Sequence, residues 1–375
     1  MSSLLRRFPA IHVTTLFLIL SATSAQAEPL RLPILVPITG FLSLEGTSQQ
    51  NGAELALAGA DVAFSVTDTA TSPEIAINAF ERAVDAADVV SVIAPMLGTQ
   101  MLALIPLADE FGIPLVTVSG TAKITELGSP NVFRFFPGDV VVKAAQARYA
   151  VEELGATRPA IISQTTAYGQ SGRAELDANL KQLGASPVFQ EALDVSVKDM
   201  LPVLLKVRES GADTLLLHLH SGPTALVIRY ARALGLDIPI IAGSAMHQPE
   251  TAVLLEPAEL KGVCAETGSS PVSEAREDVR TFVDAYRRSF DREPDAFALG
   301  QYDGAKMVLS AIAAGAQTTD EVRTHLQTAR YEGLAMTYKS DGKGNMAHSA
   351  VIICYDGADR VPDVVKRYEN LTGAL

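Results

Sequence analysis

Apolar, β-branched runs alternate with helix-like segments along most of the chain. Repeated strand–helix–strand units build parallel sheets that helices cover on both faces. The pattern therefore predicts an α/β fold with doubly wound parallel sheets. The predicted strands are Leu30–Ile38, Val62–Thr67, Val89–Ala94, Pro114–Ser119, Val132–Phe136, Pro159–Ser163, Val188–Leu193, Thr214–His218, Ile238–Ala242 and Val263–Glu266.

The segments between these strands carry apolar residues three or four positions apart, which is the spacing of one helix face. Glycine follows several of these segments, as expected where a helix ends in the left-handed conformation. The glycines in question are Gly155, Gly184, Gly211 and Gly235. The two clearest apolar faces are formed by Ile75, Ala79, Ala83 and Ala86, and by Val203, Leu204 and Val207.

The distribution of the strands predicts two lobes joined by short hinge crossings. About five predicted strands precede Gly138 and about five follow it. From Val272 to about Gln327 the chain predicts three helices in succession, and strand pattern returns only at Ala350–Cys354. Helices without strands of their own must cover sheets built earlier, so the chain is expected to cross between the lobes more than once. We predict that residues 28–138 plus 269–334 form lobe 1, and that residues 139–268 plus 335–375 form lobe 2.

Residues 1–27 are typical of a secretory signal peptide. Arg6 and Arg7 precede an apolar run, Ala10–Leu20, and the small residues that follow include an Ala-x-Ala cleavage site that ends directly before Glu28. A membrane anchor is the alternative, but the run is short for a bilayer crossing. We therefore expect a secreted protein that begins at Glu28.

Composition excludes several function classes. The formal net charge is −13, and loss of the two arginines of the signal peptide makes it −15. This acidity argues against nucleic acid and anionic membrane surfaces as partners. The two cysteines, Cys264 and Cys354, form no CxxC motif and no Cys/His cluster, so the sequence indicates neither a metal site nor a redox cofactor. Both cysteines lie in strand-like runs of lobe 2. They could form a disulfide in an oxidising compartment or remain as two buried free thiols, and the sequence does not decide between these alternatives.

Three predicted strand ends in lobe 1 lead through Gly, Ser and Thr residues into helices. These segments are Ile38–Ala58, in which Thr47 or Ser48 is the expected N-cap, Ala94–Gln100 and Val118–Glu126. Ligands of open α/β sheets bind at such ends, where free backbone N–H groups suit a small anion. Neither GxxxxGKS/T nor GxGxxG occurs, which argues against a phosphate-binding loop.

Catalytic signatures are weak. The chain has no GxSxG motif, and no second motif supports the Ser and Lys of "SGTAK". His218 and His220 are two positions apart at a predicted strand end, so both side chains can lie on the same face. A contact with a ligand and a purely structural role are both compatible with this position. An enzyme is therefore a less favoured alternative.

These motifs resemble the leucine/isoleucine/valine-type solute-binding proteins of ABC importers, which have the type I periplasmic binding fold. The resemblance covers nearly the whole chain after residue 27. It implies two lobes that close on a small-molecule ligand by hinge motion, a periplasmic location, no catalytic activity and a membrane permease as partner. A ligand-sensing subunit of a signalling receptor on the same fold remains an alternative. The resemblance rests on the order of "TGFLSLEGTSQQNGAELAL", "PLADEFGIPLVTVSGTA", "VFRFFPGD", "AYGQSGRAELDANLKQLGA", "PVLLKVRESGADTLLLH", "RYARALGL" and "QYDGAKM".

The resemblance also implies ligand contacts. The loop that binds an amino acid's α-carboxylate in the family is matched by "VSGTA", although this loop is shorter here and lacks the usual Asn/Ser-Pro after it. A second contact of lobe 1 is matched by "MLGTQ", and "AYGQ" supplies a wall from lobe 2. The implied contacts are Ser119, Gly120, Thr121, Ala122, Leu97, Gly98, Thr99, Tyr168, His220 or Ser221, Phe297 and Tyr302.

One departure from the family bears on the ligand. Ser244 stands where amino-acid-binding relatives carry an acidic residue for the α-ammonium. An ammonium group in a closed cleft without a counter-charge would cost several kcal/mol. Either Glu45 replaces the acid, or the ligand is a small organic or aromatic acid without an ammonium group, and the second interpretation is slightly favoured. The Gly40–Thr47 loop, with glycines that allow close approach, is expected to form one rim of the site.

Overall fold

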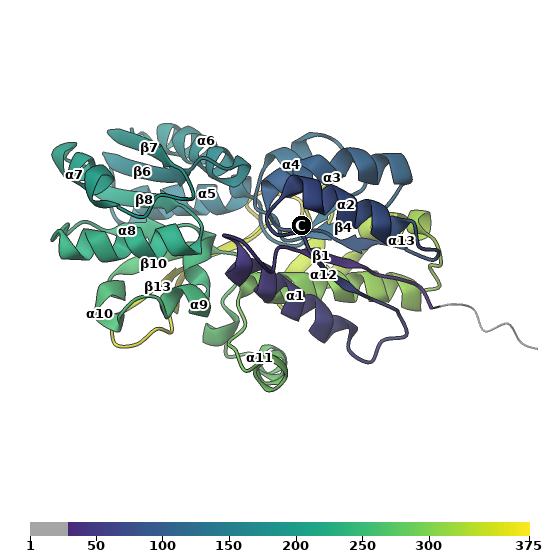
Figure 1. The fold of residues 1–375 in the computed structure, drawn as a ribbon. Helices are drawn as coiled ribbons and strands as arrows, with labels where there is room; N and C mark the ends of the chain where they lie inside the picture. Colours follow the sequence, from purple (N-terminus) through teal and green to yellow (C-terminus); the bar gives the residue numbers. More distant parts are fainter. Residues whose placement is uncertain (1–28) are drawn as a thin grey trace, which may run out of the picture.

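The computed structural model describes residues 29–375, so the predicted signal peptide lies outside the described residues. The described chain forms two α/β lobes that lie side by side (Figure 1). Each lobe is built on its own sheet. Within residues 29–375, none of the helices combines the length and the apolar character that a bilayer crossing needs.

The sheet of lobe 1 has five parallel strands in the order β2-β1-β3-β4-β5. All three residues of its interior strand β1 are buried, because helices cover both faces of a parallel sheet. The sequence therefore places continuous apolar runs here. The strands are β1 (Ile34–Val36), β2 (Val66–Asp68), β3 (Val92–Ile93), β4 (Leu115–Thr117) and β5 (Val132–Arg134).

Helices from both ends of the chain cover this sheet. The three successive helices predicted after Val272 are present, and the middle one packs along the first helix of the chain (Figure 1). A Cβ on Gly52 would lie 2.1 Å from the carbonyl oxygen of Ala298, so only glycine allows this close approach. The helices are α1 (Ser43–Leu57), α2 (Pro73–Val84), α3 (Gly98–Phe111), α4 (Lys123–Glu126), α11 (Glu277–Phe290), α12 (Ala296–Ala313) and α13 (Thr319–Thr328).

The sheet of lobe 2 is mixed. Its strand order is β14-β13-β10-β9-β8-β6-β7, and β13 and β14 run antiparallel to their neighbours. The sequence does not predict β14 or the separate hairpin of β11 and β12. The strands of this sheet are β6 (Pro159–Gln164), β7 (Phe189–Leu193), β8 (Thr214–His218), β9 (Ile240–Ala242), β10 (Val263–Thr267), β13 (Ala350–Cys354) and β14 (Asp363–Tyr368). The separate hairpin consists of β11 (Arg330–Glu332) and β12 (Thr337–Lys339).

The helices of lobe 2 end where the sequence predicts. The four glycines expected after helical segments all have positive φ, which confirms that assignment. Residues Val203, Leu204 and Val207 form the buried face of α7. The helices are α5 (Asp139–Arg148), η1 (Tyr149–Glu153), α6 (Ala167–Gln182), α7 (Leu201–Glu209), α8 (Ser221–Ala233), η2 (Ser244–His247), α9 (Pro249–Ala252), α10 (Pro257–Leu260) and η3 (Pro271–Ser273).

The division of the chain into 28–138 plus 269–334 and 139–268 plus 335–375 remains a proposal. The side chains of Tyr338 and Met346 pack among the buried residues of lobe 1. Strand β13, which begins at Ala350, belongs to the sheet of lobe 2. We therefore propose that the last crossing lies between Met346 and Ala350, later than residue 335.

The two cysteines face each other across a pair of antiparallel strands. Cys264 on β10 is the register partner of Cys354 on β13, and their Cα atoms are 4.0 Å apart. Their sulfur atoms form a disulfide. The bridge therefore ties the late strand β13 to the parallel part of the sheet.

Candidate ligand-binding site

A cavity lies between the two lobes. Its wall is mainly apolar and aromatic, with a few polar side chains. Lobe 1 contributes Leu42, Glu45, Met96, Leu97, Gly98, Gly120, Phe136 and Phe297, and lobe 2 contributes Tyr168, His220, Ser244 and Ala245.

The predicted carboxylate loop, Ser119–Ala122, is held from behind by Arg134. The guanidinium Nη1 donates to the carbonyl oxygens of Ser119, Gly120 and Thr121 at 3.4, 3.0 and 2.9 Å. Arg134 itself is 1% exposed, and burial lowers its pKa to about 10, so it stays charged at neutral pH. The arginine therefore fixes the path of the loop through its carbonyl groups.

The same loop leaves hydroxyl groups without partners. The Oγ of Ser119 and the Oγ1 of Thr121 are buried and make no hydrogen bond. The Thr121 hydroxyl lies against Gly98, the first residue of α3, where a Cβ would come within 2.0 Å of it. The first N–H groups of a helix lack intrahelical partners. This corner of the cleft therefore offers hydrogen-bond donors that suit a small anion.

Tyr168 reaches across the cleft from lobe 2. It lies in the first turn of α6, whose N-cap Thr166 accepts a hydrogen bond from the N–H of Gly169. The Tyr168 ring lies 3.8 Å from the His218 ring and 5.3 Å from the His220 ring, measured between centroids. On its other side, a Cβ on Gly120 would lie 3.2 Å from the ring. Tyr168 therefore fills the space between the lobes.

The aromatic and imidazole groups at this wall are uncharged. Burial raises the pKa of the Tyr168 hydroxyl well above its ordinary value. Burial also lowers the pKa of His220 to about 4 and that of His218 well below its ordinary value. At neutral pH these three side chains therefore present hydrogen-bonding groups rather than charges.

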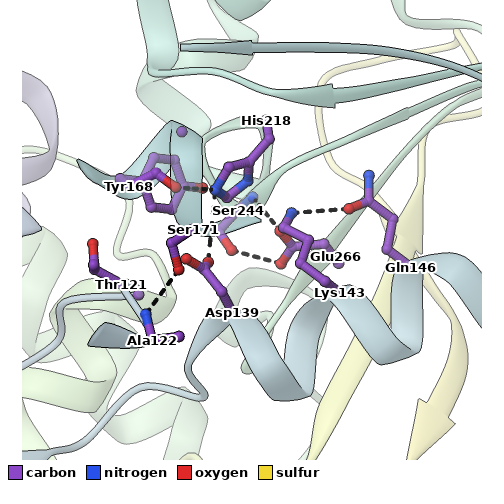
Figure 2. Close-up of polar contacts among 12 residues, drawn as sticks. Thr121, Ala122, Asp139, Lys143, Gln146, Tyr168, Ser171, His218, Ser244 and Glu266 are labelled. Carbon is purple, nitrogen blue, oxygen red and sulfur yellow. Dashed lines mark hydrogen bonds and ion pairs between the residues drawn. The ribbon is translucent and has the colours of Figure 1, made fainter. Parts of the chain in front are cut away.

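A buried polar cluster lies behind Ser244 (Figure 2). Glu266 Oε1 accepts hydrogen bonds from Lys143 Nζ at 2.5 Å and from the N–H of Ser244 at 2.9 Å. Glu266 Oε2 accepts from the Ser244 hydroxyl at 2.5 Å. Since that hydroxyl hydrogen is already engaged, Ser244 faces the cavity as an acceptor. The Glu266 carboxylate itself is paired with Lys143 and does not line the cavity.

Asp139 occupies the same region, at the start of α5. Its Oδ1 lies 3.6 Å from His218 Nε2. Burial raises the pKa of Asp139 to about 7, and the nearby charge of Lys143 opposes that rise. The sequence analysis missed Asp139, Lys143 and Glu266. The only signal for Lys143 and Glu266 was a charged residue inside an apolar stretch, "VVVKAA" and "VCAET".

The structure places part of the predicted contact set on the cavity wall. Thr99, Ser119 and Thr121 are not among the residues that line the cavity. The N–H of Ala122 donates to Ser171 Oγ of lobe 2 at 2.9 Å. The Ser221 hydroxyl donates a hydrogen bond to Glu45 Oε1. The predicted residues on the wall are Glu45, Leu97, Gly98, Gly120, Tyr168, His220, Ser244 and Phe297.

Tyr302 does not line the cavity, contrary to the prediction. It lies five positions after Phe297 on α12, which turns it about 140° around the helix axis. Its ring packs instead against Phe282, at 5.0 Å between centroids.

The opening loop Gly40–Thr47 reaches the cavity wall, but the predicted helix start and the predicted role of its glycines are wrong. The helix begins at Ser43, so neither Thr47 nor Ser48 is its N-cap, and Glu45 lies in its first turn. A Cβ on Gly46 would lie 2.0 Å from the carbonyl oxygen of Pro37, and one on Gly40 would lie 2.5 Å from Thr71 Oγ1. Both glycines therefore serve packing within lobe 1, and it is Leu42 and Glu45 that reach the cavity.

Four lining residues were absent from the predicted set: Leu42, Met96, Phe136 and Ala245. Phe136 packs against Phe297 with a distance of 4.8 Å between ring centroids. Phe136 belongs to the quoted motif "VFRFFPGD", but sequence periodicity does not show which phenylalanine of that motif turns toward the cleft.

A family model described as periplasmic binding protein matches residues 29–355. An amino acid binding protein of Pseudomonas aeruginosa is 26% identical over 299 residues, which are 78% of each chain.

Two solved structures share the fold. The branched-chain amino acid transporter substrate binding protein LivJ of Streptococcus pneumoniae, in complex with isoleucine, is 22% identical with a TM-score of 0.82, over 90% of this chain and 99% of that one. A solute binding protein of an ABC transporter from Rhodopseudomonas palustris, in complex with 3,4-dihydroxybenzoic acid, is 19% identical with a TM-score of 0.83, over 91% and 97%. The family match over most of the chain shows that the chain belongs to the periplasmic binding protein family.

Proposed function

We propose that this protein is the solute-binding component of an ABC importer. It captures a small carboxylate-containing solute between its lobes in the periplasm and delivers that solute to a membrane permease. The family match and the neighbours, which are substrate-binding proteins of transporters, support the role. Their ligands, isoleucine and 3,4-dihydroxybenzoic acid, both carry a carboxylate.

The observation that carries the ligand class is the donor-rich corner of an otherwise apolar cavity. The buried hydroxyls of Ser119 and Thr121 have no partner, and that of Thr121 lies beside Gly98 at the N-terminus of α3, which lines the cavity. A carboxylate fits donors of this kind without a full positive charge. Phe136 and Phe297 provide a surface for an apolar or aromatic body.

Native mass spectrometry of protein purified without refolding tests this function directly. We expect a co-purified small acid whose mass is lost on denaturation. Thermal-shift and calorimetric titration with amino acids and aromatic acids should then identify ligands that bind in one-to-one ratio. The function would be refuted if no carboxylate of either panel bound.

Replacement of Tyr168 tests the wall that lobe 2 supplies. Tyr168→Ala should weaken ligand binding at least about tenfold, which corresponds to 1.4 kcal/mol. The reason is that the ring packs between Gly120 of lobe 1 and the two histidines of lobe 2, so its loss destabilises the closed state. Calorimetric titration gives the affinity, and circular dichroism checks the fold. Tyr168→Phe is the control that keeps the ring. If Tyr168→Ala binds the ligand as tightly as the wild type, Tyr168 is not part of the ligand site.

A further inference from the structure

Three contacts join the segment η2–α9 of lobe 2 to the chain at the N-terminus of α12 in lobe 1. Segment η2 packs on β10 and α8, whereas α12 packs on α1 and β4, so each contact crosses between the lobes. We call these contacts the α12 interface. They are His247 Nε2 with the N–H of Ala296 at 3.0 Å, Gln248 Nε2 with Asp295 Oδ2 at 2.6 Å, and Glu250 Oε1 with Arg292 Nη1 at 3.3 Å.

The His247 contact is buried and lies next to the ligand cavity. The side chain of His247 is 3% exposed and Ala296 is 2% exposed. The His247 ring packs against the ring of Phe297 at 4.8 Å between centroids, and Phe297 lines the cavity. His247 itself does not line the cavity. It can therefore act on a ligand only through the position of the lobes and of Phe297.

The two ring nitrogens of His247 have partners whose roles are fixed. Nδ1 contacts the carbonyl oxygen of Ser244, which can only accept, so Nδ1 carries a hydrogen. Nε2 faces the backbone N–H of Ala296, which can only donate, so Nε2 must offer its lone pair. The imidazole in the α12 interface is therefore the neutral tautomer with its hydrogen on Nδ1.

A second proton on the ring would turn the Ala296 contact from attraction to repulsion. The hydrogen added to Nε2 would meet the N–H hydrogen of Ala296, and the charged ring would face the positive end of the α12 dipole. Ala296 is the first residue of the helix, so its N–H has no acceptor within the helix. The Ser244 contact survives in both forms, because Nδ1 carries a hydrogen in each.

Asp295 is the charged group of α12 that faces the ring. Its negative charge favours the charged imidazole, but burial is the larger effect and lowers the pKa of His247 below the ordinary value. The Asp295 carboxylate already accepts hydrogen bonds from the N–H of Ala298, the Ser48 hydroxyl and the Gln248 amide. It therefore does not compensate a positive ring for the loss of water.

The titratable groups of the other elements around η2 have partners of their own or are neutral. Among residues 29–375, none of them forms a hydrogen bond or an ion pair with His247. They are Glu45 of α1, bonded to Ser221; Glu250 of α9, paired with Arg292; Glu266 of β10, paired with Lys143; Arg229 and Arg232 of α8, bonded to Glu259; and His220 and Tyr355, which burial keeps uncharged by its effect on their pKa values.

We propose that His247 is a positioning residue that holds the cleft closed only as a neutral imidazole, so that acidification weakens ligand binding. This inference rests on the proposed function and adds a control of closure to it. A ligand that binds between the lobes stabilises the closed state, and any contact found only in that state contributes to its affinity. The Ala296 contact contributes in this way only while Nε2 is free of a proton.

The direction of the pH dependence follows from the two states of the ring. When the lobes part, Nε2 loses Ala296 and faces water, and the ring titrates near its ordinary pKa of about 6.5. In the closed cleft the pKa is lower. Closure therefore releases a proton below about pH 6.5, and the contribution of His247 to affinity is complete above that pH. It falls by up to about tenfold per unit as the pH drops toward the lowered value.

Calorimetric titration at pH 7.5 and pH 5.5 tests the proposal, with isoleucine, phenylalanine, 4-hydroxybenzoate and 3,4-dihydroxybenzoate as probes. The variant His247→Gln cannot titrate, but its amide oxygen can take the place of Nε2. Comparison of the wild type with this variant on the same probe cancels the titration of the ligand and of other groups. From pH 7.5 to pH 5.5 we expect the wild type to lose about tenfold more affinity than His247→Gln.

Two further variants separate the hydrogen bond from the shape of the ring. His247→Phe keeps an aromatic ring but leaves the N–H of Ala296 buried without an acceptor, so at pH 7.5 it should bind at least about tenfold more weakly than the wild type. His247→Gln should bind more tightly than His247→Phe at that pH. His325→Gln is the matched control, because His325 contacts Ser310 on α12 and does not line the cavity, and it should keep the pH dependence of the wild type. Circular dichroism checks that each variant is folded.

Nuclear magnetic resonance of protein with nitrogen-15-labelled histidine reads the ring directly. In the complex with the tightest-binding probe, Nε2 of His247 should show the chemical shift of an unprotonated nitrogen at pH 7.5 and should keep it at pH 5.5. The signal is assigned by its loss in His247→Gln. A histidine with a purely structural role elsewhere in the lobe would not link this shift to ligand binding.

The outcomes separate this inference from the proposed function. An equal loss of affinity in the wild type and His247→Gln between the two pH values would overturn the inference and leave the function intact. A complex in which His247 carries a hydrogen on Nε2 at pH 7.5 would do the same, and so would wild-type affinity of His247→Phe. If no carboxylate binds at either pH, the proposed function fails, and the inference, which needs a ligand that closes the cleft, fails with it.

Discussion

Removal of the disulfide between Cys264 and Cys354 is expected to lower the free energy of unfolding by about 2–5 kcal/mol. The bridge closes a loop with a sequence separation of 90, so its loss gives the unfolded chain a large gain in conformational entropy. The loop contains the crossing from β10 to the helices of lobe 1 and the return to β13. The bridge therefore restrains both crossings at once.

Urea unfolding of the variant Cys264→Ala/Cys354→Ala, followed by circular dichroism, measures this loss. Reduction of the wild type should shift the midpoint in the same direction, and thiol titration shows that the bridge has opened. Neither cysteine lines the cavity, so ligand affinity should change less than about threefold when measured below the unfolding transition. Two free thiols in the denatured, non-reduced wild type, or an unchanged midpoint after complete reduction, would contradict the expectation.

The sequence predicts the sheets because their strands are buried. Strand β8, Thr214–His218, is found where the apolar run predicts it, and all five of its residues are buried. Strand β14 was missed because its residues alternate in exposure and three of the six are charged, Asp363, Lys366 and Arg367. An edge strand of this kind resembles a polar loop when only hydrophobicity is considered.

Helix faces are harder to place than helices. In α2 the buried residues are Ala76, Ala79 and Phe80, whereas the predicted face began at Ile75, which is 40% exposed. A shift of one residue turns the face by about 100°, and a helix in which alanine is frequent gives little signal to decide between such registers.

The residues of the candidate site could be predicted from the sequence only in part. The residues on strand ends, such as Gly98 and Gly120, could be placed at the cleft because parallel strands end at one edge of a sheet. The contacts that determine charge join residues far apart in the chain, such as Glu45 with Ser221 and Lys143 with Glu266. No local pattern encodes these pairs, so they follow only from tertiary packing, between the lobes for Glu45 and Ser221 and within lobe 2 for Lys143 and Glu266.

Arg134 is the residue whose replacement should harm this site most. Arg134→Met is expected to lower the free energy of unfolding by about 3–5 kcal/mol, the range for breaking a buried charged network. Its guanidinium supplies donors to the carbonyl oxygens of the Ser119–Thr121 loop, to Thr125 Oγ1 at 3.0 Å and to Asn345 Oδ1. Methionine fills much of the volume but donates nothing, so these buried acceptors lose their partners.

Arg134→Met should also weaken ligand binding. The loop that Arg134 holds carries the unpaired hydroxyls of Ser119 and Thr121, and Gly120 lines the cavity. Without the arginine this loop loses the fixed path that aims its donors, and we expect the affinity for a carboxylate ligand to fall at least about a hundredfold, or 2.7 kcal/mol. Calorimetric titration at a temperature where the variant is folded measures the loss.

Two further variants make the result interpretable. Arg134→Lys keeps the positive charge but loses the planar fork that reaches several acceptors at once, so it should fold and still bind at least about tenfold more weakly than the wild type. Arg158 is the matched control, because it donates to the carbonyl oxygens of Ser210 and Gly211 but is exposed. Arg158→Met should cost less than about 1 kcal/mol and leave binding intact. If Arg134→Lys binds as tightly as the wild type, a positive charge alone is sufficient, and the loop does not depend on the guanidinium hydrogen bonds.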